Sequence, residues 1–417
     1  MELGLFPALG DGIADLRRTG QASRLVDGYL GPYARAFDRV WYASYVPEAL
    51  ADFQEAARLN PHSHLPFGNM GGLFHLAGRH AEAVEAYTEA LARRPGEPDY
   101  LEGRALSFLF LDRLQEAESD MDRVVQARPT AASYSNRGAI LARRGKFEAA
   151  MEDYGRAETL DPKDAGVPYN VGLNLARRKQ HAPAVEKFRK ALELGRDLPD
   201  TWLALGQSLN ELGRFREAEE ALTRSLELKP GDPPALMDRG RARAEQGNLE
   251  GALKDDLAAL PERPRSGPLL GDLGILYAKL RRPLESIPYL ERAVAAGKTD
   301  LYPLLGEMLL SLDRSEEAER AFSRSIEAGA DPKGFLGRAR IRHAQGRLAQ
   351  ALEDLDAAVK IAPDFAPALG YRGVVRLDLQ KPREAAADLR RAIELDPKLG
   401  RAFKPYLDQA LRSGGQE

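Results

Sequence analysis

The feature that most constrains this chain is a repeat of about 34 residues, many copies of which end in a proline. Segments of similar sequence end at Pro95, Pro129, Pro162, Pro230, Pro363 and Pro397. The first three of these prolines are 34 and 33 residues apart, and the last two are 34 residues apart. A regular period of this length is typical of a protein built from stacked copies of one small unit.

Each period contains two amphipathic segments joined by a short turn. In the second segment a small residue is followed four positions later by an aromatic residue or leucine, and three positions after that by another small residue. Ala150, Tyr154 and Ala157 are one example. These spacings place the three side chains on one stripe of a helix. The pattern therefore predicts a pair of antiparallel helices in each period.

This pattern closely resembles the tetratricopeptide repeat family, whose unit is a helix–turn–helix of about 34 residues. By this register ten units begin near His64, Pro98, Ala131, Ala165, Pro199, Pro233, Gly267, Thr299, Pro332 and Ala366. The resemblance implies an all-α fold, a right-handed superhelical solenoid of ten to eleven repeats with a C-terminal cap helix. We expect an N-terminal capping segment over 1–29, a degenerate repeat over 30–63, ten repeats over 64–397, and a cap helix and tail over 398–417.

A charged pair recurs inside the repeat. Five units carry arginine at the seventh position and aspartate at the twenty-third: Arg104 and Asp120, Arg137 and Asp153, Arg239 and Asp255, Arg338 and Asp354, and Arg372 and Asp388. The other five units have an apolar residue at the seventh position and no aspartate at the twenty-third. So strict a co-occurrence predicts structural ion pairs, in which the arginine fork binds both carboxylate oxygens. The alternative is that these charges bind an anionic ligand.

The resemblance also implies a concave groove, lined by the first helices, that binds a peptide or partner protein. The sixth position of the repeat lies near that groove and holds Asn69, Asn136 and Asn170. The arrangement resembles the asparagine ladder in the repeat region of O-linked N-acetylglucosamine transferases, and Tyr169 is assigned to the same surface. Spaced asparagines can pair with a peptide backbone irrespective of its sequence. The alternative is that asparagine is simply tolerated on a solvated helix face.

A second candidate for binding is the apolar stretch SFLFLDRL, Ser107 to Leu114. Leu106, Leu109 and Phe110 fall at groove-facing positions and are joined by Leu76 from the preceding unit. An exposed apolar patch of this kind usually marks an interface. We expect it either to bind a partner or to lie under the amino-terminal segment of the same chain.

Composition argues against several other functions. The 417 residues include 60 basic and 63 acidic ones, so no basic field points to nucleic acid or an anionic membrane. There is no cysteine, and therefore no thiol nucleophile. His62, His64, His75 and His80 are close in sequence, but the last two would point about 140° apart on a helix. We expect no catalytic residue, no cofactor, no metal and no membrane insertion.

The two ends of the chain depart from the repeat. Residues 1–46 are read as a strand (LGLFPAL), a helix and a second strand (VWYASY, 40–45), an order that loosely resembles the opening of a two-domain glycosyltransferase. The alternative is a cap of helices. At the other end, Leu399, Phe403, Tyr406 and Leu407 are expected to form the apolar face of the cap helix.

The function predicted from the sequence is a non-enzymatic scaffold that binds a protein or peptide in the concave groove. The alternative is an accessory or substrate-recruiting module of an enzyme system, for which the amino-terminal segment points to a glycosyltransferase. The amino terminus lacks the basic start of a signal peptide, so a cytoplasmic location is expected. The chaperone-binding members of the family use a clamp of lysines and asparagines at the fifth and ninth positions, and this sequence does not match it.

Overall fold

The computed structural model describes residues 39–329 and 331–414 of the chain, with side chains described from residue 49 onward. Helices make up most of these residues, and no strand occurs within the described ranges. The chain divides into two compact units between Leu212 and Gly213, which are described one at a time.

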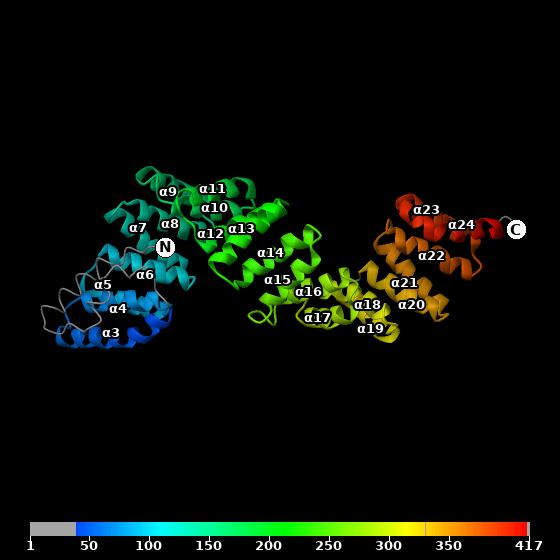
Figure 1. The fold of residues 1–417 in the computed structure, drawn as a ribbon, viewed down its shortest axis with the longest axis horizontal. Helices are drawn as coiled ribbons and strands as arrows, with labels where there is room; N and C mark the ends of the chain where they lie inside the picture. Colours follow the sequence, from blue (N-terminus) through cyan, green and yellow to red (C-terminus); the bar gives the residue numbers. More distant parts are fainter. Residues whose placement is uncertain (1–38, 330, 415–417) are drawn as a thin grey trace. The chain divides into compact units, whose positions relative to one another are not determined.

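The first unit consists of helix pairs that follow one another along the chain (Figure 1). Its helices are α3 (Arg39–Leu59), α4 (Leu65–Leu76), α5 (His80–Arg93), α6 (Pro98–Phe110), α7 (Leu114–Ala127), α8 (Ala131–Arg143), α9 (Phe147–Leu160), α10 (Gly166–Arg177), α11 (His181–Glu193) and α12 (Pro199–Glu211). The two helices of a repeat, such as α4 and α5, pack against one another, and α5 also packs against α6 of the next repeat. Each repeat therefore buries its apolar stripe against its own partner helix and against its neighbour.

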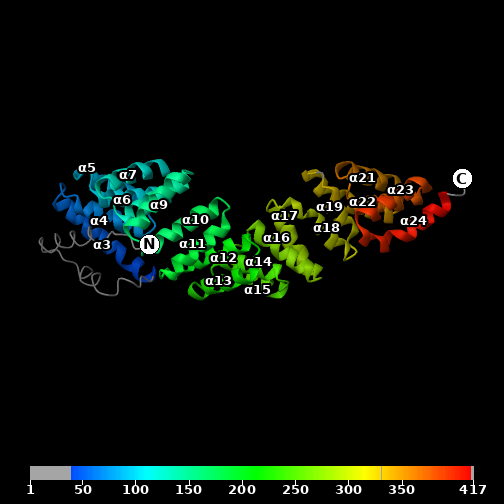
Figure 2. The same cartoon turned by 90° about the horizontal axis from the view of Figure 1, so that it is seen from above.

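The second unit continues the same succession of pairs (Figure 2). Its helices are α13 (Phe215–Leu228), α14 (Pro233–Glu245), α15 (Leu249–Ala259), α16 (Gly267–Lys279), α17 (Pro283–Ala295), η1 (Thr299–Leu301), α18 (Tyr302–Leu310), α19 (Ser315–Gly329), α20 (Pro332–Ala344), α21 (Leu348–Ile361), α22 (Ala366–Asp378), α23 (Pro382–Leu395), η2 (Pro397–Leu399) and α24 (Gly400–Gly414). Seven of these α-helices have proline in their first two positions, where the backbone N–H has no partner within the helix in any case: α14, α16, α17, α18, α20, α22 and α23.

The turn between the two helices of a repeat depends on one residue in the left-handed backbone region. Every one of the ten repeats has a positive φ at its fifteenth position. Glycine fills it in five repeats, as at Gly145 with φ of 76°, and a non-glycine residue such as Lys179 with φ of 59° fills it in the others. After this residue the Lys146 N–H donates to the Leu141 carbonyl at 2.9 Å, which ends the first helix.

The helices of a repeat come close because a glycine on the first faces a large side chain on the second. A Cβ placed on Gly138 would lie 2.8 Å from the ring of Tyr154, and one on Gly306 would lie 2.6 Å from the ring of Phe322. Both rings are almost fully buried. Side chains at these glycine positions would therefore push the helices apart.

The cap helix α24 covers the last repeat, packing on α22 and α23. Phe403 and Ala410 are buried and Leu407 is partly buried, a stripe spaced by four and three residues. Tyr406 is 41% exposed, so the prediction that it belongs to this apolar face is wrong. It lies beside the stripe, and Ala410 completes the stripe instead.

At the amino-terminal end, helix α3 corrects one prediction. The second strand expected over 40–45 is wrong, because these residues lie inside α3. An aromatic run has strand propensity, but propensity is weak and here α3 packs against α4, with Leu50 and Phe53 buried in the same apolar cluster as Met70. The capping segment over 1–29 and the first strand lie outside the described residues.

The close contact between Gly138 and the ring of Tyr154 leads to a prediction about stability. Gly138→Ala should lower the free energy of unfolding by about 1–3 kcal/mol, because the new methyl group overlaps a buried ring. Gly155, also within a helix, has nothing within 4 Å of an added Cβ, so Gly155→Ala should be neutral or stabilising by up to about 1 kcal/mol. Urea unfolding followed by circular dichroism checks both. Equal effects of the two substitutions would contradict the packing described here.

Candidate interaction surface

The five arginine–aspartate pairs join the two helices of their repeats. In each pair the arginine donates from Nε and one terminal nitrogen to the two carboxylate oxygens, with N–O distances of 2.6–3.1 Å. All five aspartates are buried. For Arg137, the hydrogen bond to Asp153 raises the pKa of the guanidinium further above its ordinary value. The structure thus brings together every pair that the internal comparison of repeats linked.

The third nitrogen of each arginine reaches a residue that the sequence reasoning missed. It donates at 3.0–3.3 Å to a short polar side chain on the second helix of the preceding repeat, at the twenty-fifth position: Thr88, Asp122, Thr223, Ser323 or Asp356. The five repeats without an arginine are preceded there by glutamine, glycine, arginine, leucine and glutamate. Comparing neighbouring repeats, rather than helices within one repeat, would have found this signal. Each arginine therefore ties three helices together.

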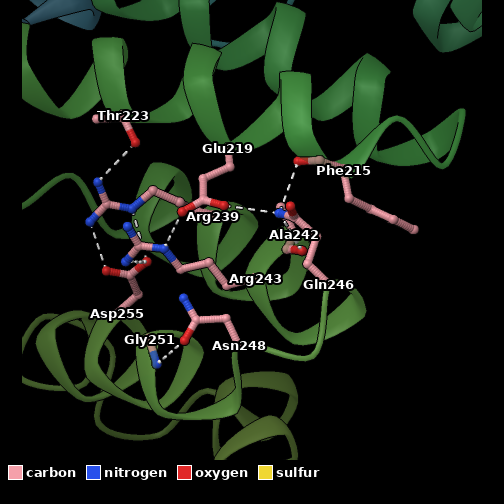
Figure 3. Close-up of polar contacts among 10 residues, drawn as sticks. All are labelled: Phe215, Glu219, Thr223, Arg239, Ala242, Arg243, Gln246, Asn248, Gly251 and Asp255. Atoms are coloured by element: carbon pink, nitrogen blue, oxygen red, sulfur yellow. Dashed lines mark hydrogen bonds and ion pairs between the residues drawn. The ribbon is translucent and has the colours of Figure 1, made fainter.

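In the second unit a second arginine binds the same aspartate. Arg243, four residues after Arg239, donates to Asp255 at 2.8 Å and to Glu219 at 2.7 Å (Figure 3). Gln246 donates to the other oxygen of Glu219 at 2.9 Å, which connects α14 to α13. Arg342 and Arg376 repeat the arrangement at Asp354 and Asp388. Two guanidinium groups on one buried carboxylate form a network rather than an isolated pair.

The asparagines of the sixth position point toward the preceding repeat. Asn136 donates to Glu102 at 2.8 Å, and Asn170 donates to Ser135 at 3.1 Å. Asn69 is only 2% exposed, and within the described residues its amide atoms have no hydrogen-bond partner. The expectation that Asn69 faces an open groove is therefore wrong, whereas Asn136 and Asn170 remain partly exposed. The orientation of these asparagine side chains is set by hydrogen bonds to the preceding repeat. A sequence pattern within one repeat gives no information about such bonds.

The predicted apolar patch separates into exposed and buried members. Phe110 is 56% exposed and Leu76 is 45% exposed, as expected of an interface. Leu106 is 3% exposed, and Leu109 packs against the core, so the expectation that these two face a partner is wrong. Neighbouring first helices pack side by side here, α6 against both α4 and α8, and cover the flanks of α6.

Two of the four clustered histidines, the buried His75 and the partly buried His80, lie beside the ring of Phe110. His80 stacks on Phe110, with ring centroids 4.4 Å apart, and His75 lies 5.1 Å from His80. The angular separation expected for one helix does not apply, because α4 ends at Leu76 and α5 begins at His80. Burial, and then the neighbouring His80, lower the pKa of His75 to about 4. Within the described part of the chain no three metal-ligating side chains come together.

Tyr169 occupies a packed position at the start of α10. The Arg196 guanidinium carbon lies 4.1 Å from the centre of its ring, and the ring of Phe188 lies 6.0 Å away. Burial, followed by the charge of Asp200, raises the pKa of Tyr169 to about 12. The ring is therefore held between α10 and its neighbours.

Asp256 is the one departure from the packing rule for the twenty-fourth position. The other nine repeats have a large apolar or aromatic side chain there: Tyr87, Met121, Tyr154, Phe188, Leu222, Leu290, Phe322, Leu355 and Leu389. Asp256 is 3% exposed, and its Oδ1 lies 2.7 Å from a Cβ placed on Gly240. Burial, and then the charges of Asp272 and Asp255, raise the pKa of Asp256 to about 8. The repeat pattern already contained this anomaly, which our sequence analysis passed over.

Comparison with known proteins identifies the family. The tetratricopeptide repeat profile matches residues 35–98, 203–267, 272–335, 304–368 and 336–400, and a second profile of the same description matches 131–164. These matches span more than half of the chain, which therefore belongs to the tetratricopeptide repeat family. Repeats of this family support a role as a protein-interaction scaffold. No helix within 39–329 and 331–414 is both long and apolar enough to cross a membrane.

The curated relatives share the repeats but are longer proteins. Human tetratricopeptide repeat protein 7B is 34% identical over 30% of this chain and 15% of its own length. Hsp70-Hsp90 organizing protein 2 of Arabidopsis thaliana is 30% identical over 22% of this chain and 17% of its own length. U-box domain-containing protein 70 of Oryza sativa subsp. japonica is 27% identical over 29% of this chain and 15% of its own length. The aligned part of the chain thus spans less than a fifth of each of these relatives.

Solved structures of similar proteins include YrrB, described as a TPR protein with an unusual peptide-binding site. It is 25% identical, covers 42% of this chain and 91% of its own, and has a TM-score of 0.39. The APC/C assembly Cut9-Hcn1 is 14% identical, covers 89% of this chain and 95% of its own, and has a TM-score of 0.43.

Because Arg137 and Asp153 form a buried ion pair, we predict that a second substitution can restore the stability lost when one partner is removed. Arg137→Ala should lower the free energy of unfolding by about 1–4 kcal/mol, because it leaves a buried carboxylate without its charged partner. The double variant Arg137→Leu with Asp153→Ala copies the apolar–small pairing of the other repeats and should recover most of the loss. Chemical unfolding of the three proteins checks this. A double variant as unstable as the single one would show that the pair does not act as a structural link.

Because the carboxyl of Asp256 is buried, we predict that the free energy of unfolding depends on pH. Its pKa is about 8 in the folded protein and about 3.9 when unfolded, so between these values only the folded state holds the proton. The contribution to stability is therefore complete below pH of about 4 and is lost as the pH rises to about 8, with a slope of up to about 1.4 kcal/mol per pH unit.

Asp256→Asn cannot titrate and should lack this slope, so the difference in the free energy of unfolding between variant and wild type should change between pH 5, 7 and 9 in urea unfolding. Glu245→Gln changes the charge equally at an exposed position of α14 and should leave the pH dependence unchanged. Identical pH profiles for wild type and Asp256→Asn would contradict the raised pKa.

Proposed function

We propose that the protein is a non-enzymatic scaffold that binds a protein or peptide along the first helices of its amino-terminal unit. The partner would lie across α6, α8 and α10. The observation that carries the proposal is Phe110, an aromatic side chain that is more than half exposed at the end of α6. Exposed aromatic residues are enriched among the side chains that dominate binding energy at protein interfaces.

Phe110 does not stand alone on this surface. Leu76 is exposed on the neighbouring first helix, and His80 stacks on the Phe110 ring and holds it in one orientation. A ring that is already oriented loses little side-chain entropy when a partner covers it. These three side chains therefore supply a preorganised apolar contact.

Asn136 and Asn170 supply polar contacts next to this patch. Each uses one N–H of its amide to bond the preceding repeat, to Glu102 and Ser135 respectively. Among the described residues these are the bonds that the two amides form, so each carbonyl oxygen remains for a partner's N–H. Glu102 is itself bound by Arg128 at 2.7 Å, which fixes the orientation of the Asn136 amide.

The curated relatives favour a protein partner, since two of them are named for organising Hsp70 and Hsp90. The carboxylate clamp of chaperone-binding members is not matched in this sequence, so we do not propose the same ligand. The alternative of a glycosyltransferase accessory rests on residues 1–46, of which 1–38 lie outside the described residues and 40–45 lie in helix α3 instead of the expected strand.

A photo-crosslinking experiment tests the proposed surface. A benzophenone amino acid at Phe110 should capture a protein partner from an extract of the native cell, because that side chain lies on the binding face. The same amino acid at Leu160, which is 55% exposed at the end of second helix α9, is the matched control and should capture none.

The captured partner then allows a quantitative measurement. Phe110→Ala should weaken its binding about 10-fold or more, a loss of at least about 1.4 kcal/mol, and Asn136→Ala with Asn170→Ala should weaken it further. Leu160→Ala should leave the affinity unchanged. Capture at Leu160 but not at Phe110 would place the interface on the second helices and overturn the proposal.

A further inference from the structure

Positive charge is concentrated where helices α8 and α10 end and turn into the second helices of their repeats. Residues 143–146 and 177–180 include six basic side chains and no acidic one: Arg143, Arg144, Lys146, Arg177, Arg178 and Lys179. All of these except Arg144 are exposed. The equivalent residues after α4 and α6 include one arginine each, and each of these arginines binds a glutamate three residues later. We call the six basic residues the basic edge.

The basic edge begins beside Phe110. Arg143 donates from Nη1 to the Leu109 carbonyl at 2.8 Å and from Nη2 to Asp112 at 2.9 Å, so its guanidinium group lies against the end of α6. Arg143 and Arg177 also occupy the thirteenth position of their repeats, which is the position of Phe110 in its own repeat. The exposed row along the ends of α6, α8 and α10 therefore changes from an aromatic side chain to two arginines.

The two basic turns are neighbours in the structure. Arg178, at the end of α10, lies with Nη2 at 3.5 Å from Glu148, and Glu148 follows Lys146 by two residues at the start of α9. The guanidinium carbon of Arg178 is 5.6 Å from the centre of the Phe147 ring. The six basic residues are therefore one continuous feature of the first unit.

The acidic side chains nearby do not neutralise this charge. Glu118 accepts a hydrogen bond from Lys146 at 2.7 Å and also binds Arg144. Arg177 and Lys179 form no side-chain hydrogen bond or ion pair with any residue that the structure describes. The exposed edge thus retains unpaired positive charge, although the chain as a whole has a slight excess of acidic residues.

The positive charge is also short in extent. On one side of the edge Asp112 lies in the turn after Phe110, with its side chain 75% exposed. On the other side the thirteenth position of α12 is the exposed Glu211. A nucleic acid or an anionic membrane presents negative charge over a longer path, and acidic side chains at both ends would repel it. A short acidic segment of a protein fits the edge better.

We propose that the basic edge binds a short acidic segment, made of aspartate or glutamate side chains, of the partner that covers Phe110. The inference rests on the proposed function, because the acidic segment belongs to that partner. Carboxylates form charge-assisted hydrogen bonds with guanidinium and ammonium groups. Packed helices lie about 10 Å apart, so Phe110 and Arg177, two repeats apart, are separated by about 20 Å. An extended chain spans this distance in about six residues.

Peptides of defined sequence test the basic edge before the partner is known. The first peptide consists of a phenylalanine, five glycine and serine residues, and four glutamates, and in the second peptide glutamine replaces every glutamate. Both carry a fluorophore, and anisotropy measures their binding to the full chain at about 20 and about 150 mM salt. The glutamate peptide should bind about 10-fold more tightly at the lower salt concentration. The difference should shrink at the higher concentration, because the charges are exposed.

Two double variants assign the binding to the edge. Arg177→Gln with Lys179→Asn removes the two unpaired charges, and asparagine tolerates the φ of 59° at the second position. This variant should reduce the preference for the glutamate peptide about 3-fold or more. Arg401→Gln with Lys404→Gln removes the same charge from exposed positions of α24 and should leave the preference unchanged.

Equal or undetectable binding of the two peptides would overturn the inference. So would displacement of the glutamate peptide by a uridine oligonucleotide or by phosphatidylserine vesicles at a lower concentration than by the unlabelled peptide, because the edge would then bind nucleic acid or a membrane. Neither result would affect the capture of a protein partner at Phe110. Failure of the acidic segment and failure of the proposed function are therefore distinguishable.

Discussion

The close approach of the two helices within each repeat is the constraint on which the rest of the structure depends. Gly138 meets Tyr154 across this contact, and the adjacent residues on the two helices are Arg137 and Asp153. The Arg137 guanidinium reaches the carboxylate with two hydrogen bonds beside this contact, and the same two bonds form after Arg104 and Arg338, where alanine replaces the glycine. The packing contact and the ion pair are therefore one unit, and the third nitrogen of the arginine extends it to the preceding repeat.

In the other five repeats the seventh and twenty-third positions do not hold an arginine–aspartate pair. In the repeat beginning at Gly267 the seventh position is Leu273, and Tyr289 at the twenty-third position stacks on Tyr277 with centroids 5.5 Å apart. A charged pair is not needed for the fold, since an apolar pair also fills the space. A helix that packed on the wrong repeat would leave a buried aspartate without its arginine, and this would disfavour the wrong pairing.

Much of this could be predicted from the sequence because each repeat is an internal copy of the others. The link between Arg137 and Asp153 follows from comparing positions within a repeat. The burial of Leu106 and the orientation of Asn136 depend on packing between repeats, where one helix covers the flank of the next. The strand expected over 40–45 was wrong because a short aromatic run carries propensity but no information about what packs on it. Asp256 shows that departures from an internal consensus are as informative as agreement with it.

The central claim is that the first helices of the amino-terminal unit form the binding face and that the second helices only support it. Hydrogen–deuterium exchange on the full chain, with and without its captured partner, tests this most directly. The account predicts that the partner slows exchange in peptides from α6, α8 and α10, while peptides from α7 and α9 exchange at an unchanged rate. Protection confined to α7 and α9 would contradict it.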